Sequence, residues 1–124
     1  KPIMGDGRKY PDLIPTLVFL AAHIEGKSTF VGLEVLKHKE SNRIAEMLRI
    51  LDFAGVHYQY DAETYTLSIE GTVEKYRAFE YFAPNDHRMI MMAALFMRKN
   101  YGGLIYNAQH VKKSFPNFFE FLAD

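Results

Sequence analysis

The stretch PDLIPTLVFLAA, residues 11–22, decides the fold, because it predicts a buried helix whose pattern returns later in the chain. Pro15 falls in the first turn, where the missing N–H of proline costs no hydrogen bond, and Gly26 follows the apolar run as a stop. We therefore predict a buried helix over residues 13–25.

This pattern returns after 74 residues. Asp12 and Asp86 each precede a long apolar run, and in that register LVFLAA falls on MMAALF without a gap. Lys39 and Lys113 have the same separation, and each precedes a second apolar run. Because the polar positions agree as well as the apolar ones, the sequence indicates an internal repeat.

Turn residues and apolar spacing divide the rest of the chain into alternating helices and strands. The predicted strands are 27–33, a hairpin of 56–61 and 65–71, 76–82 and 103–107; the further predicted helices are 40–54, 86–100 and 114–124. The fold class is therefore α/β (α+β), built from repeated βαβαββ units. Residues 10–71 form one unit, and residues 75–124 form a second that lacks its final strand pair.

Composition bounds the functions that the chain can have. With 124 residues, 48% hydrophobic and 24% charged, it matches one globular domain. Lys plus Arg equals Asp plus Glu at 15 each, so no overall field favours nucleic acid, and the longest apolar run is too short to span a membrane. There is no cysteine, which excludes thiol catalysis and fits a reducing, cytoplasmic location. The first residue is Lys1, and we expect the chain to be a piece of a longer protein.

Cations gather where helices are predicted to begin. LKHKESNR places Lys39 and Arg43 at the start of the 40–54 helix, and DHR and KKS repeat the feature further on. The positive end of a helix dipole disfavours cations, so a bound anion is one explanation. On that predicted first turn Glu40 lies close to both cations. The alternative is a solvated surface ion pair between Glu40 and Arg43, worth under ~1 kcal/mol.

Other conspicuous residues do not indicate a site. The histidines at positions 23, 38, 57 and 110 lack the spacing of a zinc motif, and we predict no metal. The methionines of MIMMAALFM fit a helix core better than a binding surface. Tyr58 and Tyr60 could stack on bases, but no basic stripe accompanies them, so nucleic-acid binding is not expected.

Four motifs resemble those of the EPSP synthases (3-phosphoshikimate 1-carboxyvinyltransferases), a family of enolpyruvyl transferases. KESNR (39–43) resembles the family's KES/TDR motif, and NDHRM (85–89) resembles its DHR-M motif. KKSFPNFFEFL (112–122) resembles the K-S/T-F-P-x-F-F ending, and PDLIPTLVFLAA resembles the helix that follows Pro-Asp. The motifs occur in the family's order over residues 10–124.

The resemblance implies a two-domain enzyme in which each domain is an inside-out α/β barrel of three such units. The 124 residues would be part of the C-terminal domain, partnered by the absent N-terminal domain of the same chain. In the family, strands from the N-terminal region close the last unit, which agrees with the missing strand pair.

The implied reaction transfers the enolpyruvyl group of phosphoenolpyruvate to the 5-hydroxyl of shikimate 3-phosphate and releases phosphate, without a cofactor. Such chemistry needs an acid, a base and cations that hold the anionic groups. By motif position the resemblance assigns the following roles: catalysis to Asp12, Lys39 and Glu40; phosphoenolpyruvate binding to Arg43, Arg88 and Lys113; shikimate 3-phosphate binding to Asp12 and Lys39; and orientation of the site to Asp86 and His87.

Structural explanations compete with three of these roles. Asp12 could be a helix N-cap, His87 a capping or packed histidine, and Lys113 a solvated surface lysine. Two positions depart from the family pattern: Asn42 replaces the usual Asp, and Val35 stands where some members place a polar substrate contact.

Two alternative functions stay open. The sister enzyme that uses UDP-N-acetylglucosamine has a similar fold, but it typically lacks the Lys of the Lys-Glu pair, the His of DHR and the KSFP ending. A non-catalytic binding module of the same fold is the other alternative. We expect the isolated 124 residues to fold incompletely or to associate through an open edge, and to show no turnover.

Overall fold

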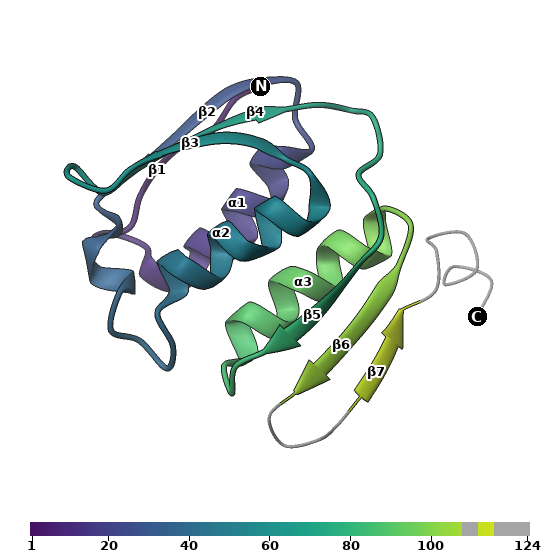
Figure 1. Cartoon of the computed structure of the whole chain (residues 1–124). Helices are drawn as coiled ribbons and strands as arrows, with labels where there is room; N and C mark the ends of the chain where they lie inside the picture. The colour runs from purple at the N-terminus through teal and green to yellow at the C-terminus, as the bar shows by residue number, and fades with distance from the viewer. Residues whose placement is uncertain (108–111, 116–124) are drawn as a thin grey trace.

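The computed structural model describes residues 1–107 and, in backbone, 112–115, as a mixed α/β fold (Figure 1). Its elements in chain order are β1 (Met4–Asp6), η1 (Pro11–Leu13), α1 (Ile14–Ala22), β2 (Gly26–Val31), η2 (Leu33–Leu36), α2 (Arg43–Ala54), β3 (His57–Asp61), β4 (Thr66–Gly71), β5 (Phe79–Ala83), α3 (His87–Lys99), β6 (Gly103–Asn107) and β7 (Lys112–Phe115).

The strands form two sheets. One has the order β1-β2-β4-β3, with β1 parallel to β2 and the other pairs antiparallel. The other has the order β5-β6-β7, with β5 parallel to β6 and β7 antiparallel to β6. In both sheets a helix joins the parallel pair, α1 in the first and α3 in the second.

The three α-helices lie between the sheets. In Figure 1 the four-stranded sheet covers α1 and α2, and β5 and β6 lie beside α3. Helix α3 contacts both α1 and α2, so the helices hold the two sheets together. The largest fully buried side chains of this core include Phe30, Met47, Leu67, Tyr81 and Phe96. Helix α2 also contacts β5, so it packs against both a strand of the second sheet and α3, the helix that joins β5 to β6.

Local sequence explains where α2 begins and ends. The side chain of Asn42 caps the helix by accepting a hydrogen bond from the Ala45 N–H at 3.2 Å. Gly55 ends it in the left-handed conformation, with φ 91°, which glycine adopts without strain. The prediction of a helix over 40–54 was therefore wrong at its start, since Lys39 and Glu40 precede the cap.

Several other predicted bounds need correction. Helix α1 stops at Ala22 rather than residue 25. The Phe19 carbonyl pairs with the ring of His23, while the backbone N–H of His23 bonds the carbonyls of Leu20 and Ala21 instead. Strand β5 starts at Phe79 rather than residue 76, because the Tyr76 N–H bonds the Asn100 side chain instead of a strand. The strand that a βαβαββ unit places before its first helix is β1, for which no residue range was predicted, and no short helix was predicted at η2. The hairpin of β3 and β4, helix α3 and strand β6 are confirmed.

The predicted C-terminal helix is wrong at its first residues. Ser114 and Phe115 belong to β7, whose backbone pairs with β6. The remainder of that prediction, residues 116–124, lies outside the described residues.

The segment between the sheets ties the helix ends together. Tyr76 donates from its hydroxyl to the Ala22 carbonyl at 2.7 Å, at the end of α1. Arg77 donates to the carbonyls of Phe53 and Asp52 at 2.7 and 3.0 Å, at the end of α2. These bonds satisfy carbonyls that a helix end leaves without an intrahelical partner. The linker thus fixes the ends of both helices while it passes between them.

His23 completes this junction in its neutral form. Its Nδ1 lies 2.8 Å from the Phe19 carbonyl oxygen and its Nε2 lies 3.0 Å from Asn100 Nδ2. The Asn100 amide is oriented by two other bonds, since Oδ1 accepts from the Tyr76 N–H and Nδ2 donates to the Phe96 carbonyl. Asn100 therefore presents a donor, and His23 Nε2 must accept. Burial, more than the positive charge of Lys99, lowers the pKa of His23.

We predict that stability falls as the pH drops below about 6.5, the ordinary histidine pKa. The unfolded chain binds the proton more readily than the folded chain, because the pKa of His23 is lowered by folding. Protonation of His23 lowers the free energy of unfolding by at most about 1.4 kcal/mol per pH unit, and it has no such effect above that ordinary pKa. Urea denaturation across this range measures it, and His23→Gln should flatten the slope. His57→Gln removes an exposed histidine and serves as control; equal slopes in all three proteins would contradict the prediction.

None of the helices in the described part of the chain is long and apolar enough to cross a bilayer.

Candidate functional site

A buried ion pair joins the starts of α2 and α3. Arg43, the first residue of α2, has a side chain that is only 4% exposed. Its Nε donates to Asp86 Oδ2 at 2.9 Å, and its Nη2 donates to Asp86 Oδ1 at 3.2 Å. The guanidinium therefore grips the Asp86 carboxylate by both oxygens, in the two-point geometry that arginine favours.

Asp86 makes two further contacts beyond pairing with Arg43. Its Oδ1 accepts from the Arg88 N–H at 3.0 Å, which makes it the N-cap of α3. Its Oδ2 accepts from the Ser41 hydroxyl at 2.7 Å. Asp86 thus connects the loop before α2, the first residue of α2 and the first turn of α3. Sequence reasoning missed Ser41, because a hydroxyl that bonds a residue 45 positions away leaves no local pattern.

Electrostatics favour the charged form of both partners. Burial opposes ionisation of Asp86, but the hydrogen bonds from Arg43 and Ser41 outweigh it and keep the pKa of this carboxyl below its usual value. Burial likewise opposes the charge on Arg43, and the bonds with Asp86 and Asp12 raise its pKa instead. The pair is ionised at neutral pH.

Two exposed carboxylates occupy the outer side of the Arg43 guanidinium. Glu40 Oε1 accepts from Nη2 at 2.6 Å, and Asp12 Oδ1 accepts from Nη1 at 3.2 Å. Their side chains are 65% and 59% exposed, whereas that of Asp86 is 1% exposed. Solvent competes for Glu40 and Asp12 but not for Asp86. The two outer contacts are therefore weaker than the inner one.

Arg88 adds a second guanidinium to this group. Its Nη1 donates to the Asp12 carbonyl at 3.3 Å, and its Nη2 lies 3.8 Å from Asp12 Oδ2. We call Asp12, Glu40, Arg43, Asp86 and Arg88 the charged cluster. The cluster draws on η1, the loop before α2, the start of α2 and the start of α3, so five of the eight predicted site residues meet.

Three predicted site residues lie outside the charged cluster. Lys39 is exposed in the loop before α2 and makes no ion pair with residues 1–107. His87 is exposed at the first position of α3. Lys113 lies in β7, where its backbone pairs with Ile105, so the helix predicted from residue 114 does not begin directly after it. Its side chain is outside the described part.

The structure corrects two structural explanations and refines a third. Asp12 is not the cap of α1, whose N-cap is Leu13, and lies within η1 instead. His87 neither caps nor packs, because Asp86 takes the cap. The expected Glu40–Arg43 ion pair is present, but Arg43 is buried and so the pair is not a fully solvated bridge. The cation that seemed to oppose the helix dipole is neutralised by Asp86 and the two outer carboxylates.

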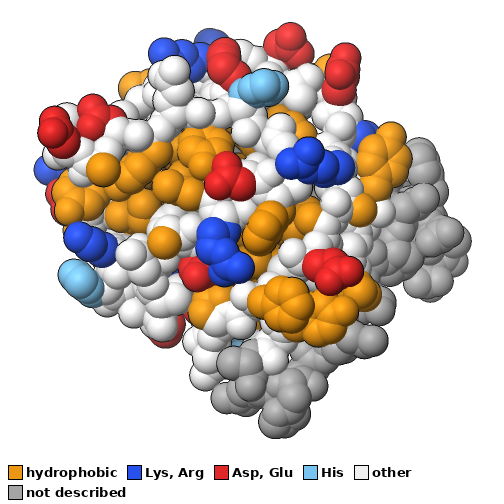
Figure 2. All heavy atoms as spheres, in the orientation of Figure 1, with side chains coloured by type: hydrophobic (Ala, Val, Ile, Leu, Met, Phe, Trp, Pro, Cys, Tyr) orange, Lys and Arg blue, Asp and Glu red, His pale blue; other side chains and the backbone are white. Residues whose placement is uncertain are grey.

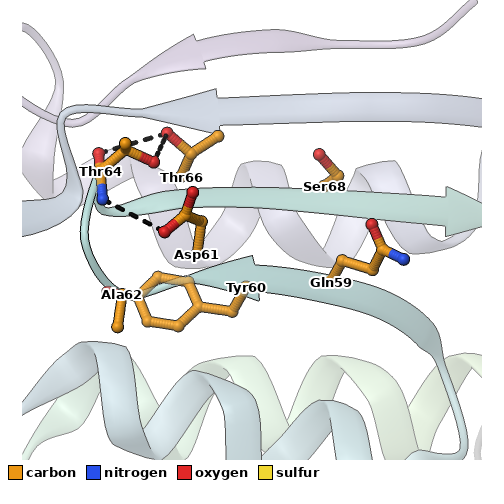
Figure 3. A pocket seen from close by; sticks show the side chains of 7 residues that line it. All are labelled: Gln59, Tyr60, Asp61, Ala62, Thr64, Thr66 and Ser68. Carbon is orange, nitrogen blue, oxygen red and sulfur yellow. Dashed lines mark hydrogen bonds between the residues drawn. The ribbon is translucent and has the colours of Figure 1, made fainter.

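Two surface hollows formed by described residues lie away from the charged cluster. One, of roughly 670 Å³, lies along the β3–β4 hairpin and is lined by polar side chains such as Gln59, Asp61 and Ser68 (Figure 3). A second, of roughly 280 Å³, lies between α2 and the hairpin, and its apolar lining includes Ile44, Leu48 and Tyr65. Figure 2 shows hydrophobic side chains gathered on the left of the molecule, where α2 and the hairpin lie in Figure 1. Among described residues, no group of three or more His, Asp or Glu is placed to hold a metal ion.

The charged cluster is suited to exchanging anions. Its two guanidiniums face carboxylates that are largely solvated, and an incoming phosphate or carboxylate can take the places of Glu40 and Asp12 without disturbing Asp86. The displaced carboxylates would then stand beside the bound anion, where each can accept a proton and, once protonated, deliver it.

Comparison with known proteins shows which family the chain resembles. The family model for EPSP synthase (3-phosphoshikimate 1-carboxyvinyltransferase) matches residues 1–122. Curated 3-phosphoshikimate 1-carboxyvinyltransferases are similar: that of Pyrococcus furiosus is 38% identical and that of Pyrococcus abyssi 36% identical, each over 96% of this chain and 28% of the relative. That of Sulfurisphaera tokodaii is 35% identical over 90% of this chain and 26% of the relative.

The chain spans about a quarter of the length of these curated relatives. Because the family model covers nearly the whole chain, the 124 residues belong to the EPSP synthase family.

Proposed function

We propose that the protein containing this chain transfers the enolpyruvyl group of phosphoenolpyruvate to the 5-hydroxyl of shikimate 3-phosphate and releases phosphate. The observation that carries the proposal is the charged cluster, in which two guanidiniums lie against two solvated carboxylates. The reaction passes through a tetrahedral adduct and needs anion binding together with an acid and a base. The charged cluster contains both kinds of group.

Each member of the charged cluster has a role in this proposal. Arg43 and Arg88 bind the phosphate and carboxylate of phosphoenolpyruvate, with Lys113 as a third cation. Glu40 delivers a proton to the methylene carbon, which makes the neighbouring carbon electrophilic. Asp12 handles the proton of the sugar hydroxyl, and exposed Lys39 assists there. Asp86 orients Arg43 from behind and does not touch substrate.

We infer that the chain is part of the C-terminal domain, with residues 10–71 and 75–124 as two repeat units of the βαβαββ type. Support comes from the two parallel strand pairs, β1 with β2 and β5 with β6, each joined by one helix. Strand β1, at Met4–Asp6, precedes residue 10, so the first unit would begin before the bound given for it. The absent N-terminal domain of the same chain would complete the site and supply the second unit's closing strands.

The test of this function is an assay of phosphate release from phosphoenolpyruvate by the full-length protein. Release is expected with shikimate 3-phosphate as acceptor. Release with UDP-N-acetylglucosamine alone would assign the protein to the sister reaction, and release with neither would leave a binding module of the same fold.

We predict that Arg88→Ala raises the KM for phosphoenolpyruvate far more than the KM for shikimate 3-phosphate, by about 10- to 100-fold against twofold or less. Lys113→Ala should behave in the same way. The reason is that these cations serve the anions of phosphoenolpyruvate in the proposed site. Steady-state kinetics of the full-length protein measure both constants.

The matched control for these variants is Arg8→Ala. Arg8 is an exposed cation that pairs with Asp6 and Glu34, away from the charged cluster. Its removal should change neither constant. Equal losses for the two substrates in Arg88→Ala would contradict the assigned role.

A further inference from the structure

Two polar contacts, one turn apart on α2, join this helix to the segment of the chain that contains β5 and the start of α3. The first is the Arg43–Asp86 pair at the start of the helix. The second comes from Tyr81 in β5, whose side chain is fully buried and whose hydroxyl donates to Glu46 Oε1 at 2.7 Å. Because Arg43 and Glu46 are three positions apart, they lie on neighbouring parts of one helix face.

The Glu46 carboxylate is held firmly enough to act as an anchor. Arg49 Nη1 donates to the same oxygen at 2.8 Å, and the Glu46 side chain is 18% exposed. The Arg49 guanidinium lies 5.6 Å from the centre of the Tyr81 ring and 5.5 Å from that of Phe53. Tyr81 therefore meets α2 through both its hydroxyl and its ring, against a carboxylate that has little freedom to turn away.

The same contact bears on the geometry of Arg43. Strand β5 ends at Ala83, and Asp86 follows after a short connection. Any shift of β5 along α2 would move Asp86 relative to Arg43, so the bond from Tyr81 limits that shift. Without the Tyr81 hydroxyl, the Arg43–Asp86 pair would be the main polar contact left between α2 and the segment from β5 to α3. The same pair orients Arg43 toward Asp12 and Glu40.

We propose that Tyr81 is a positioning residue, which holds α2 against β5 through Glu46 so that the Arg43 guanidinium is correctly placed for the anionic groups of phosphoenolpyruvate. This role rests on the proposed function. If Tyr81 served only to pack the core, its loss would affect both substrates alike. The proposed role instead makes phosphoenolpyruvate binding depend on Tyr81 more than shikimate 3-phosphate binding does.

The test is Tyr81→Phe in the full-length protein. The ring is kept and the bond to Glu46 is lost. The KM for phosphoenolpyruvate should rise about tenfold, because a small displacement of the Arg43 guanidinium strongly weakens its contacts with the substrate. The kcat and the KM for shikimate 3-phosphate should change by less than about twofold. Glu46→Ala removes the same bond from a partly exposed position, and the double variant should lose no more than either single variant.

Tyr58→Phe is a closely matched control. The Tyr58 hydroxyl donates to Asp52 Oδ1 at 2.7 Å, so the variant removes a bond of the same kind and length from the other end of α2. Burial raises the pKa of Tyr58 to about 12, and burial together with Glu46 raises that of Tyr81 as well, so both phenols are protonated donors at neutral pH. Tyr58→Phe should leave the KM for phosphoenolpyruvate unchanged.

The outcomes separate this role from the function itself. An active wild-type protein whose KM for phosphoenolpyruvate is the same in Tyr81→Phe and Tyr58→Phe would overturn the role and leave the function intact. So would equal increases for both substrates, which would indicate general loosening. A wild-type protein without transfer to shikimate 3-phosphate would refute the proposed function, and the role with it. If Tyr81→Phe fails to fold, Glu46→Ala and its KM values decide.

Discussion

Replacing Glu40 with Gln in the full-length protein is expected to lower kcat by about 10²- to 10⁴-fold, the usual range for loss of a general acid or base. Glutamine keeps the shape of the side chain and can still accept the hydrogen bond that Glu40 receives from Arg43. It cannot deliver or take a proton at the methylene carbon. Steady-state kinetics with both substrates saturating measure the effect.

The pattern of constants distinguishes proton transfer from anion binding at this residue. Because Glu40 occupies the outer side of Arg43 in the free chain, neutralising it should not weaken phosphoenolpyruvate, and its KM should stay within about threefold of wild type. Glu34→Gln alters an exposed carboxylate near Arg8 and serves as control. A Glu40→Gln enzyme with wild-type kcat would remove Glu40 from the chemistry.

Replacing Asp86 with Ala is expected to lower the free energy of unfolding by about 3–5 kcal/mol, since it leaves Arg43 buried without its inner partner. The loss of the α3 cap adds about 1 kcal/mol. Glu40 and Asp12 cannot compensate, because their carboxylates are mostly solvated. Urea denaturation of the variant beside the wild type measures the difference.

Two comparisons separate capping from charge in this prediction. Asp86→Asn keeps a good helix cap but loses the ion pair, so it should retain only the capping part of the stability. Asp52→Ala removes an exposed carboxylate that accepts from Tyr58, and should cost less than about 1.5 kcal/mol. An Asp86→Ala protein as stable as Asp52→Ala would show that the inner pair contributes no more than a surface contact.

Local patterns in the sequence predicted a large part of the fold. Apolar spacing identified α3 and β6 almost to the residue, and period-two alternation identified the β3–β4 hairpin. Helix α2 begins at Arg43 rather than residue 40, because Asn42, a common N-cap residue that differs from the Asp of the family motif, caps it. Asn42 caps the helix as Asp would.

The features that were missed depend on contacts far apart in the sequence. Sequence motifs named Arg43 and Asp86 separately, but a bond across 43 positions and the burial of both side chains are set by how α2 packs on α3. The bonds of Ser41 and Tyr81 have the same origin. Strand β7 has four residues and no periodic pattern of its own, and its pairing partner β6 determines it.

The buried pair of Arg43 and Asp86 also makes the two sheets dependent on each other. One charge comes from the part of the chain that builds the four-stranded sheet, and its counter-charge comes from the part that builds the other. Neither part alone can keep its charge out of water without a large penalty. The cost of separating the two sheets therefore falls mainly on the charged cluster, so unfolding of either sheet alone should be disfavoured.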